Sequence, residues 1–392
     1  MMRRTLLFLA TSLAAFAADY SLIHERMNDY VNRGKIPGAV TLVRHKGEIV
    51  HFDAIGFQDI EAKKPMTKDS IFQVMSMTKP FTGVSIMMLV EEGKIALNDA
   101  VEKHLPEFRG QMVMDVAADG KQTLRKPSRP ITVRDLMTHI SGMTSPPVGL
   151  QELYTRMDKP LADAVLVYSQ TPLVFDPGTK WQYSNTGIAT LGRIVEVQSK
   201  MKFEDFLAQR IFQPLAMKDS HIFLPESKHS RLAAVYRIAE DGKLRKSGPE
   251  ILGGDSLNYR KGAKYAAPEF ALYTTASDLA NFYQMMLNGG VFGGKRLISK
   301  ASVELMTVVH TGDLKAGHMP GTAFGLTWEV VKDTLGGQAL LSEGTFGHGG
   351  AFGTHGFVDP KKGLVGVFLI QMSSNASDAK YSFMSIAEAK TE

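Results

Sequence analysis

A serine and a lysine, Ser76 and Lys79, stand three residues apart in the segment 72–81. On a helix this spacing places the two side chains on one face, where they can interact. A serine hydroxyl becomes an effective nucleophile when a neighbouring base takes its proton. Burial and positive neighbours lower the pKa of a lysine, which allows its neutral amine to act as that base. The pair therefore indicates a nucleophile for acyl transfer.

The residues around this pair predict the elements that must position it. Residues 72–75 predict a strand-like approach, and the apolar run after Pro80 predicts a helix that is buried nearly all round. Pro80 is tolerated because the first N–H groups of a helix have no partner within it. Gly93 is the expected C-terminal cap. We therefore expect Ser76 at the start of a buried helix.

The pattern Ser-x-x-Lys is short, and Ser199 with Lys202 also matches it. That second pair lies in a polar stretch, where a helix cap and a solvated lysine are the simpler interpretation. The strand followed by a buried helix favours Ser76 over Ser199 as the nucleophile.

Length and composition exclude several classes of protein. A chain of 392 residues can bury a large core in one domain or two. The formal net charge of +5 is spread along the chain and does not favour a nucleic-acid partner. The chain contains no cysteine, which excludes disulfides and thiol catalysis.

The first eighteen residues have the features of a bacterial export signal. Arg3 and Arg4 precede an apolar stretch over 6–16, and the small residues at 15–17 suit cleavage after Ala17 or Ala18. The apolar run is short for a membrane span, although a retained anchor is the alternative. We expect a signal peptide at 1–18, a catalytic domain at 19–392, export to the periplasm or medium, and no stable membrane insertion after cleavage.

Strand-like segments occur at both ends of the chain, with helical patterns between them. Alternating or strongly apolar segments predict strands at 39–43, 49–55, 324–330, 346–350, 356–358 and 364–372. Helical patterns cover 132–139, 188–195, 203–212 and 277–287, the first opened by a capping box of Thr132 and Asp135. We expect an α/β (α+β) chain with a sheet part at about 19–79 and 268–392. A helical and loop part is expected at about 80–267, in which 225–268 is a long loop or lid.

Ser-x-x-Lys is a signature of serine β-lactamases and penicillin-binding proteins. The resemblance extends over 72–93, 132–143, 177–217 and 347–372, including Leu-Met-Thr-His-Ile-Ser-Gly at 136–142. These segments occur in the expected order and cover most of the mature chain. The chain therefore resembles the superfamily of class C β-lactamases, family VIII carboxylesterases and D-aminopeptidases. The resemblance implies a β-lactamase/transpeptidase-like fold, with a mainly antiparallel sheet flanked by helices and a helical subdomain.

The resemblance also assigns the Tyr-x-Asn element of the family to Tyr183, Ser184 and Asn185. It implies that Tyr183 acts as a base toward Ser76 and then as an acid toward the leaving group. Asn185 is expected to orient Lys79 and the acyl chain. A phenol beside an ammonium should have a lowered pKa, which suits proton exchange near neutrality. The structural alternative is a half-buried tyrosine beside Trp181. The same spacing at 30–32 falls in a helical segment.

His348, Gly349 and Gly350 stand where the family has a Lys-Thr-Gly strand motif. The resemblance implies that the backbone N–H groups of Ser76 and Ala351 form an oxyanion hole. A neutral imidazole, with an ordinary pKa of about 6.5, holds the carboxylate of a β-lactam less well than a lysine. With a histidine at this position, the chain resembles the esterases and D-amino-acid peptidases of the superfamily more than its true β-lactamases. One alternative is that the strand motif is His-Thr-Gly at 310–312. Another is that His348 is a strand histidine that only bonds a backbone carbonyl.

Other motifs do not support other chemistries. The sequence Gly-Asp-Ser-Leu at 254–257 spells a lipase signature, but it lies in an irregular stretch far from the start of the chain. No Gly-x-Ser-x-Gly is present, which argues against an α/β-hydrolase fold. His348 and His355 lack a carboxylate at the spacing of a zinc site. We expect no metal and no cofactor.

Together, the residues and the resemblance predict a serine hydrolase that forms an acyl-enzyme on Ser76. The preferred substrate is a small ester. The alternatives are a D-aminopeptidase or D-Ala-D-Ala carboxypeptidase acting on substrates that contain D-amino acids, or a weak β-lactamase. A catalytically silent binding or assembly protein is the alternative from another class. The sequence leaves the oligomeric state open.

Overall fold

The structure is a computed structural model that describes residues 19–144, 157–250, 252–337, 339–374 and 376–391. The predicted signal peptide at 1–18 lies outside the described residues. Within these ranges, none of the helices combines the length and the apolar character needed to cross a bilayer.

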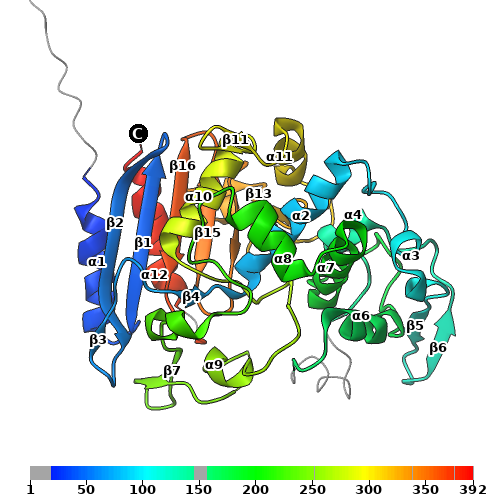
Figure 1. The fold of residues 1–392 in the computed structure, drawn as a ribbon, viewed down its shortest axis with the longest axis horizontal. Coiled ribbons are helices and arrows are strands. Elements are labelled where there is room, and N and C mark those ends of the chain that lie inside the picture. Colours follow the sequence, from blue (N-terminus) through cyan, green and yellow to red (C-terminus); the bar gives the residue numbers. More distant parts are fainter. Residues whose placement is uncertain (1–18, 145–156, 251, 338, 375, 392) are drawn as a thin grey trace, which may run out of the picture.

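An antiparallel sheet built from both ends of the chain forms one half of the molecule (Figure 1). Its eight strands follow the order β12-β13-β14-β15-β16-β1-β2-β3. The strands from the N-terminal part are β1 (Gly38–His45), β2 (Glu48–Asp59) and β3 (Lys64–Pro65). Those from the C-terminal part are β12 (Thr322–Phe324), β13 (Glu329–Val331), β14 (Phe346–Gly349), β15 (His355–Asp359) and β16 (Leu364–Leu369). Because β1 pairs with β16, the two ends of the chain meet inside one sheet.

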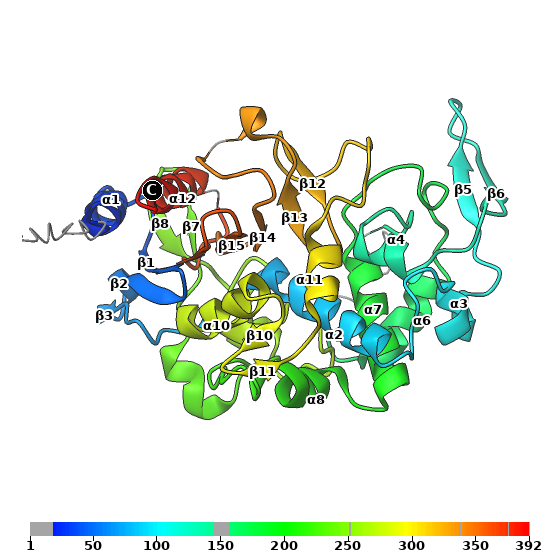
Figure 2. The same ribbon diagram turned by 90° about the horizontal axis from the view of Figure 1, so that it is seen from above.

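Both faces of this sheet are covered by helices. Strand β16 is apolar at every position but Gly366: Val365, Val367 and Leu369 join the larger core, while Leu364 and Phe368 join a smaller one. The smaller core lies under α1 (Ser21–Asn32) and α12 (Ser377–Ala389), and the larger one under α10 (Ala276–Leu287). Figure 2 shows α1 and α12 together on one side of the sheet and α10 on the other. The run of apolar residues is therefore the sequence of a strand buried on both faces.

A group of helices packs beside the sheet and forms the other half of the molecule (Figure 1). Its central helix, α2 (Lys79–Glu91), contacts α7 and is buried from Lys79 through Leu89, as predicted. Gly93 follows with φ +70° and donates its N–H to Val90 O, as expected of a cap. The other helices of this half are α3 (Val101–His104), α4 (Val133–Met137), α6 (Leu161–Ser169), α7 (Asn185–Ser199) and α8 (Phe203–Leu207). The capping box of α4 is confirmed: Asp135 N–H bonds the Thr132 hydroxyl, and Thr132 N–H bonds the Asp135 carboxylate.

The remaining elements are short. Two small hairpins join β5 (Val113–Val116) to β6 (Gln122–Arg125) and β7 (Tyr236–Ile238) to β8 (Leu244–Lys246). The others are β4 (Phe72–Gln73), α9 (Ser256–Tyr259), β9 (Tyr273–Thr274), β10 (Val291–Phe292), β11 (Lys295–Arg296) and α11 (Lys300–Thr307). The segment 225–268, expected to be a long loop or lid, thus contains the hairpin β7–β8 and the helix α9.

The prediction of one half-buried strand over 324–330 is wrong. The chain turns between β12 and β13, where Gly325 N–H bonds Trp328 O at 2.9 Å. Thr327 has φ +66° and donates its N–H to Met137 O of α4 at 2.8 Å. Leu326 and Trp328 are completely buried because this turn packs between the sheet and the helices. The alternation in the sequence therefore reflects a buried turn and not the two faces of a strand.

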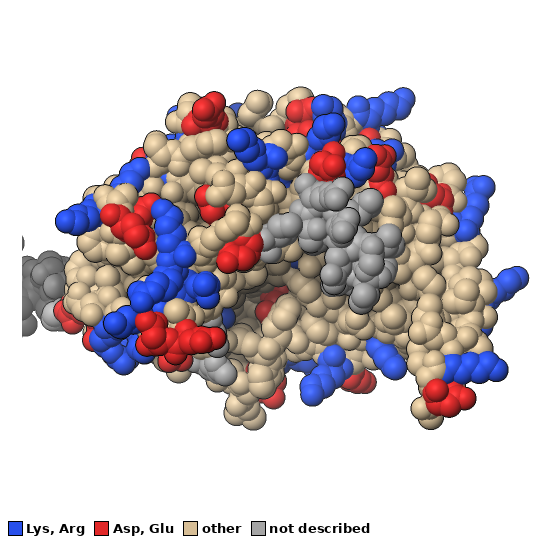
Figure 3. Space-filling view, turned by 90° about the horizontal axis from the view of Figure 1, so that it is seen from below, with Lys and Arg blue, Asp and Glu red and all other residues tan. Residues whose placement is uncertain are grey.

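Charges of both signs are mixed on the surface. On the face in Figure 3, lysine and arginine side chains lie among aspartate and glutamate side chains. Arg125, for example, forms ion pairs with Asp115 and Asp176, and Arg245 pairs with Asp241.

Candidate active site

Ser76 lies in a tight turn between β4 and α2. A 3₁₀ turn spans Met75–Thr78, and Met75 is buried with φ +51°, an uncommon value for a residue with a side chain. The Thr78 hydroxyl donates to Met75 O at 2.7 Å and accepts from Leu272 N–H at 3.0 Å. The surrounding chain therefore fixes the conformation that presents Ser76 at the start of the helix.

Lys79 contacts the Ser76 hydroxyl from the first residue of α2. Its Nζ lies 2.9 Å from Ser76 Oγ and 2.9 Å from the backbone oxygen of Glu269, and its side chain has no exposed surface. Burial lowers the pKa of Lys79 from 10.5 to about 7, with the Glu269 carboxylate opposing this effect. A neutral amine is therefore well populated near neutral pH, which is the form that can accept the proton of Ser76.

Tyr183 lies next to both residues, but its pKa moves in the direction opposite to our expectation. Its ring centroid is 4.7 Å from Lys79 Nζ. Enclosure of the phenol by protein raises the pKa of Tyr183 well above the ordinary value, and its hydrogen bond with Ser76 offsets this only in part. The expected lowering is wrong because burial dominates, and the charges of Glu329 and Glu269 raise the pKa of Tyr183 further. Tyr183 therefore remains a protonated phenol, and Lys79 is the group that titrates near neutrality.

Aromatic and imidazole rings surround Tyr183. The ring of His139 lies 4.5 Å from that of Tyr183, and the ring of His318 lies 4.8 Å away. The rings of Trp181 and Phe324 also lie close, with centroids 6.4 and 6.5 Å from that of Tyr183. Such contacts restrict the ring to one orientation.

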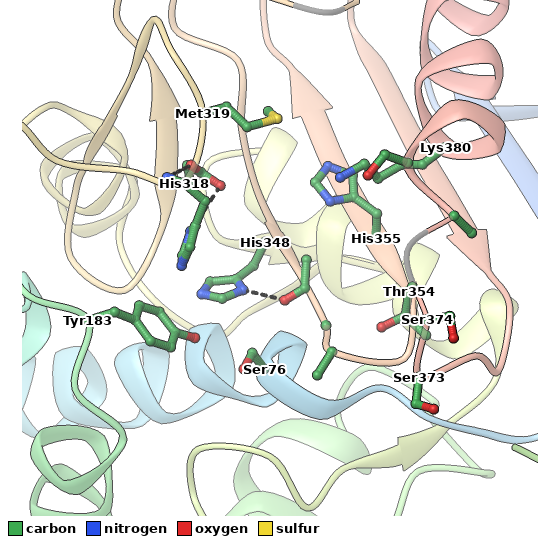
Figure 4. A pocket seen from close by; sticks show the side chains of 17 residues that line it. Ser76, Tyr183, His318, Met319, His348, Thr354, His355, Ser373, Ser374 and Lys380 are labelled. Carbon is green, nitrogen blue, oxygen red and sulfur yellow. Dashed lines mark hydrogen bonds and ion pairs between the residues drawn. The ribbon is translucent and has the colours of Figure 1, made fainter. Parts of the chain in front are cut away.

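The end of β14 forms the opposite wall of a cavity of about 400 Å³ (Figure 4). The cavity brings together six of the predicted residues: Ser76, Tyr183, His348, Gly349, Gly350 and Ala351. Lys79 reaches it through its bond to the Ser76 hydroxyl.

His348 is buried at the end of β14, and its role toward a substrate stays a prediction. It lines the cavity, and its Nδ1 lies 2.7 Å from Gly349 O, to which it must donate. Burial and the nearby Lys79 lower the pKa of His348 to about 3, so the imidazole is neutral. Its Nε2 has no hydrogen-bond partner in the described ranges and can only accept.

The turn after β14 packs against the residues that precede Ser76. Thr354 Oγ1 donates to Val74 O at 3.1 Å, and a Cβ on Gly350 would lie 2.2 Å from that same oxygen. Only glycine fits there. Across the ranges that the structure describes, the N–H groups of Ser76 and Ala351 have no hydrogen-bond partner. An oxyanion hole requires two free donors directed at one point beside the nucleophile, and this role of the two N–H groups stays a prediction.

Asn185, like Lys79, does not line the cavity, and among the described residues it has no hydrogen bond to one that does. It is the first residue of α7, and its Oδ1 is buried without a hydrogen-bond partner in the described part of the chain. Besides its bond to Ser76, Lys79 donates a hydrogen bond to Glu269 O, and not to Asn185. The role of Asn185 toward Lys79 stays a prediction.

The cavity continues toward α12, where residues outside the predicted site form its walls. These are His318, Met319, Glu329, Gly353, Thr354, His355, Ser373, Ser374, Ala376, Ser377 and Lys380. They come from four separate segments. Ser377 and Lys380, at the start of α12, also stand at the Ser-x-x-Lys spacing. Of these, His355 is considered only as a possible zinc ligand, and it adjoins the predicted strand 356–358.

The alternative motifs lie elsewhere. His310 bonds Leu305 O and Arg134, and Ser256 is buried in α9. Ser199 and Lys202 lie at the end of α7 and just before α8. Among the described residues, no group of three or more histidine, aspartate or glutamate side chains is arranged to hold a metal ion.

Known proteins are similar to this chain over most of its length. A family model described as Beta-lactamase matches residues 21–391. Protein Rv1367c of Mycobacterium tuberculosis is 31% identical over 388 residues, covering 93% of this chain and 94% of that protein. Esterase EstB of Burkholderia gladioli is 27% identical over 375 residues, covering 89% and 91%. The solved structure of EstCE1, a hydrolase with promiscuous acyltransferase activity, aligns with a TM-score of 0.78 at 22% identity, covering 94% and 98%. The fold is therefore the β-lactamase/transpeptidase-like fold that the sequence predicted.

Proposed function

The chain belongs to the Beta-lactamase family, here a family of serine hydrolases, and from that premise we propose that it is a carboxylesterase for small esters. The observation that carries the proposal is the 2.9 Å hydrogen bond between Lys79 Nζ and Ser76 Oγ. It lies in a site where burial lowers the pKa of the lysine to about 7. An activated serine at the bottom of a cavity is the arrangement that acyl transfer needs.

The reaction proceeds in two steps. The neutral Lys79 amine takes the proton of Ser76, and Oγ attacks the ester carbonyl carbon. The oxyanion of the tetrahedral intermediate accepts hydrogen bonds from the N–H groups of Ser76 and Ala351. As the intermediate collapses, Tyr183 donates its phenol proton to the leaving alkoxide and recovers a proton from the Lys79 ammonium. A water molecule then attacks the acyl-enzyme, with Lys79 and Tyr183 transferring protons as before, and the acid is released.

The neutral His348 supports an ester over a β-lactam as substrate. Burial lowers the pKa of His348 to about 3, so its imidazole is neutral. It therefore cannot form an ion pair with the carboxylate that a β-lactam carries. A small ester has no such requirement. The 27% identity to Esterase EstB over most of both chains supports the same substrate class.

One observation favours a second candidate, a carboxypeptidase acting on D-Ala-D-Ala peptides. Lys380 of α12 lines the cavity, where burial lowers its pKa and the charge of Glu329 opposes this effect. Its amine contacts the Tyr381 ring at 4.4 Å. A lysine in this position could hold the terminal carboxylate of a peptide.

We propose further that the protein is exported, because residues 1–18 combine two arginines, a short apolar stretch and small residues at the cleavage position. An export signal suits an enzyme that meets esters or cell-wall peptides outside the cytoplasm.

The test is turnover of a substrate panel by wild type and by Ser76→Ala. The panel contains p-nitrophenyl acetate, butyrate and octanoate, a chromogenic cephalosporin and a D-Ala-D-Ala peptide. We expect ester hydrolysis that Ser76→Ala reduces by about a thousandfold or more. The matched control, Ser256→Ala, removes another buried serine hydroxyl and should retain ester turnover. Equal turnover by Ser76→Ala would contradict the proposal, and turnover of the peptide alone would favour the second candidate.

A further inference from the structure

His139 is a buried histidine, outside the predicted catalytic set, that contacts both chain neighbours of Tyr183. Its Nδ1 accepts a hydrogen bond from Ser184 N–H at 3.1 Å. Its backbone oxygen accepts one from Gln182 N–H at 2.9 Å. Its ring lies 4.5 Å from the Tyr183 ring, tilted by 37°. His139 therefore holds the chain on either side of Tyr183 and also packs against the ring itself.

The hydrogen bond from Ser184 fixes the protonation state of His139. A backbone N–H can only donate, so Nδ1 must carry a lone pair and the ring proton must lie on Nε2. Protonation of Nδ1 would break this bond. The positive or titratable groups that face His139 are Lys79, His348 and His318, and together with burial they hold its pKa well below the ordinary value. His139 is thus a neutral acceptor.

The backbone of His139 is also specialised. Its φ is +60°, in the left-handed region, directly after the last turn of α4. Histidine and asparagine enter this region more readily than most residues with a side chain. Such conformations persist where the surroundings fix them, often beside functional groups. A histidine that only filled the core would need neither this conformation nor two hydrogen bonds to one segment.

We propose that His139 is a positioning residue that holds the Tyr183 phenol in place for proton transfer to the leaving group. The proposal rests on the proposed function, since it assigns His139 a role within that reaction. The Nδ1 acceptor and the backbone oxygen set the position of the segment 182–184, and the imidazole ring sets the orientation of the phenol.

Two variants separate the acceptor from the ring. His139→Asn keeps an acceptor, because Oδ1 takes the position of Nδ1, and asparagine tolerates the left-handed backbone. His139→Phe keeps an aromatic ring of similar size but leaves the Ser184 N–H buried without a partner. We expect kcat of His139→Phe to fall on the order of 10- to 100-fold, with KM nearly unchanged. His139→Asn should retain several times more activity than His139→Phe.

The choice of substrate distinguishes positioning from a general structural defect. An alkyl ester, such as ethyl butyrate, needs a proton on its leaving alkoxide, whereas p-nitrophenolate leaves without one. His139→Phe should therefore reduce turnover of ethyl butyrate far more than turnover of p-nitrophenyl butyrate. In a Tyr183→Phe background the same substitution should have little further effect. Thermal unfolding of each variant provides the measure of fold integrity.

Three results would overturn the proposal while leaving the proposed function intact. These are equal losses on both esters, equal activity of the asparagine and phenylalanine variants, and full additivity with Tyr183→Phe. An inactive wild type on both esters would instead contradict the proposed function, and the role of His139 with it. Preferential loss on ethyl butyrate, restored in part by asparagine, supports the proposal.

Discussion

Replacing Lys79 by methionine should stabilise the protein at low pH while abolishing its activity. Burial lowers the pKa of Lys79 from 10.5 to about 7, and each pKa unit corresponds to about 1.36 kcal/mol. Protonated Lys79 therefore destabilises the folded state by about 5 kcal/mol relative to a neutral side chain. Methionine has a similar length and no charge, but it forfeits the hydrogen bonds to Ser76 and Glu269, which contribute about 1 kcal/mol each.

The effect must depend on pH in a defined window. Between about pH 7 and 10.5 the unfolded chain binds a proton at Lys79 that the folded protein does not, so wild-type stability rises with pH. The rise approaches about 1.4 kcal/mol for each pH unit. Below pH 7 both states are protonated and the full destabilisation is present. Lys79→Met should therefore gain about 3 kcal/mol over wild type at pH 6, and about nothing near pH 9.

The assay is urea unfolding of both proteins at pH 6, 7, 8 and 9, followed by tryptophan fluorescence. Lys300→Met is the matched control because its side chain is 78% exposed, and it should show no such trend. A difference between wild type and Lys79→Met that stays constant from pH 6 to pH 9 would refute the reasoning. It would mean that Lys79 titrates near 10.5 in the folded protein and cannot act as a base at neutral pH.

Three further substitutions test the site and its support. Tyr183→Phe should lower kcat on ethyl butyrate by about 10²- to 10⁴-fold at an unchanged melting temperature, and an equal loss on p-nitrophenyl butyrate would argue against its role as an acid. Gly350→Ala should lower the urea midpoint and slow acylation, since its Cβ would lie 2.2 Å from Val74 O; wild-type behaviour would show that the turn can move. Thr132→Ala removes the capping hydroxyl of α4 and should cost about 1 kcal/mol in unfolding free energy without affecting ester turnover, and a loss of turnover would contradict a purely structural role.

The features that the sequence could predict are local. The helix after Ser76 and the apolar strand β16 are encoded by periodicity within one segment, and so is the capping box at Thr132. The order of the motifs indicated the family, because several short patterns occur together along the chain.

The features that it could not predict depend on contacts between distant segments. The carbonyl of Glu269 that holds Lys79 lies 190 residues away along the chain and carries no side-chain signal. The raised pKa of Tyr183 results from enclosure by segments that pack around it only in the folded protein. Trp328 looked like part of a strand because a buried turn and a strand can share an alternating pattern.

The measurement that tests the central claim most directly is the rate at which a fluorophosphonate labels the wild-type protein between pH 5 and 9. Mass spectrometry of the digested protein identifies the labelled residue. We predict a single adduct on Ser76, formed at a rate that increases with pH through about 7 and then levels off as Lys79 loses its proton. An adduct on Ser256, no adduct on any residue, or a Ser76 labelling rate without an inflection near pH 7 would contradict the claim that Lys79 activates Ser76.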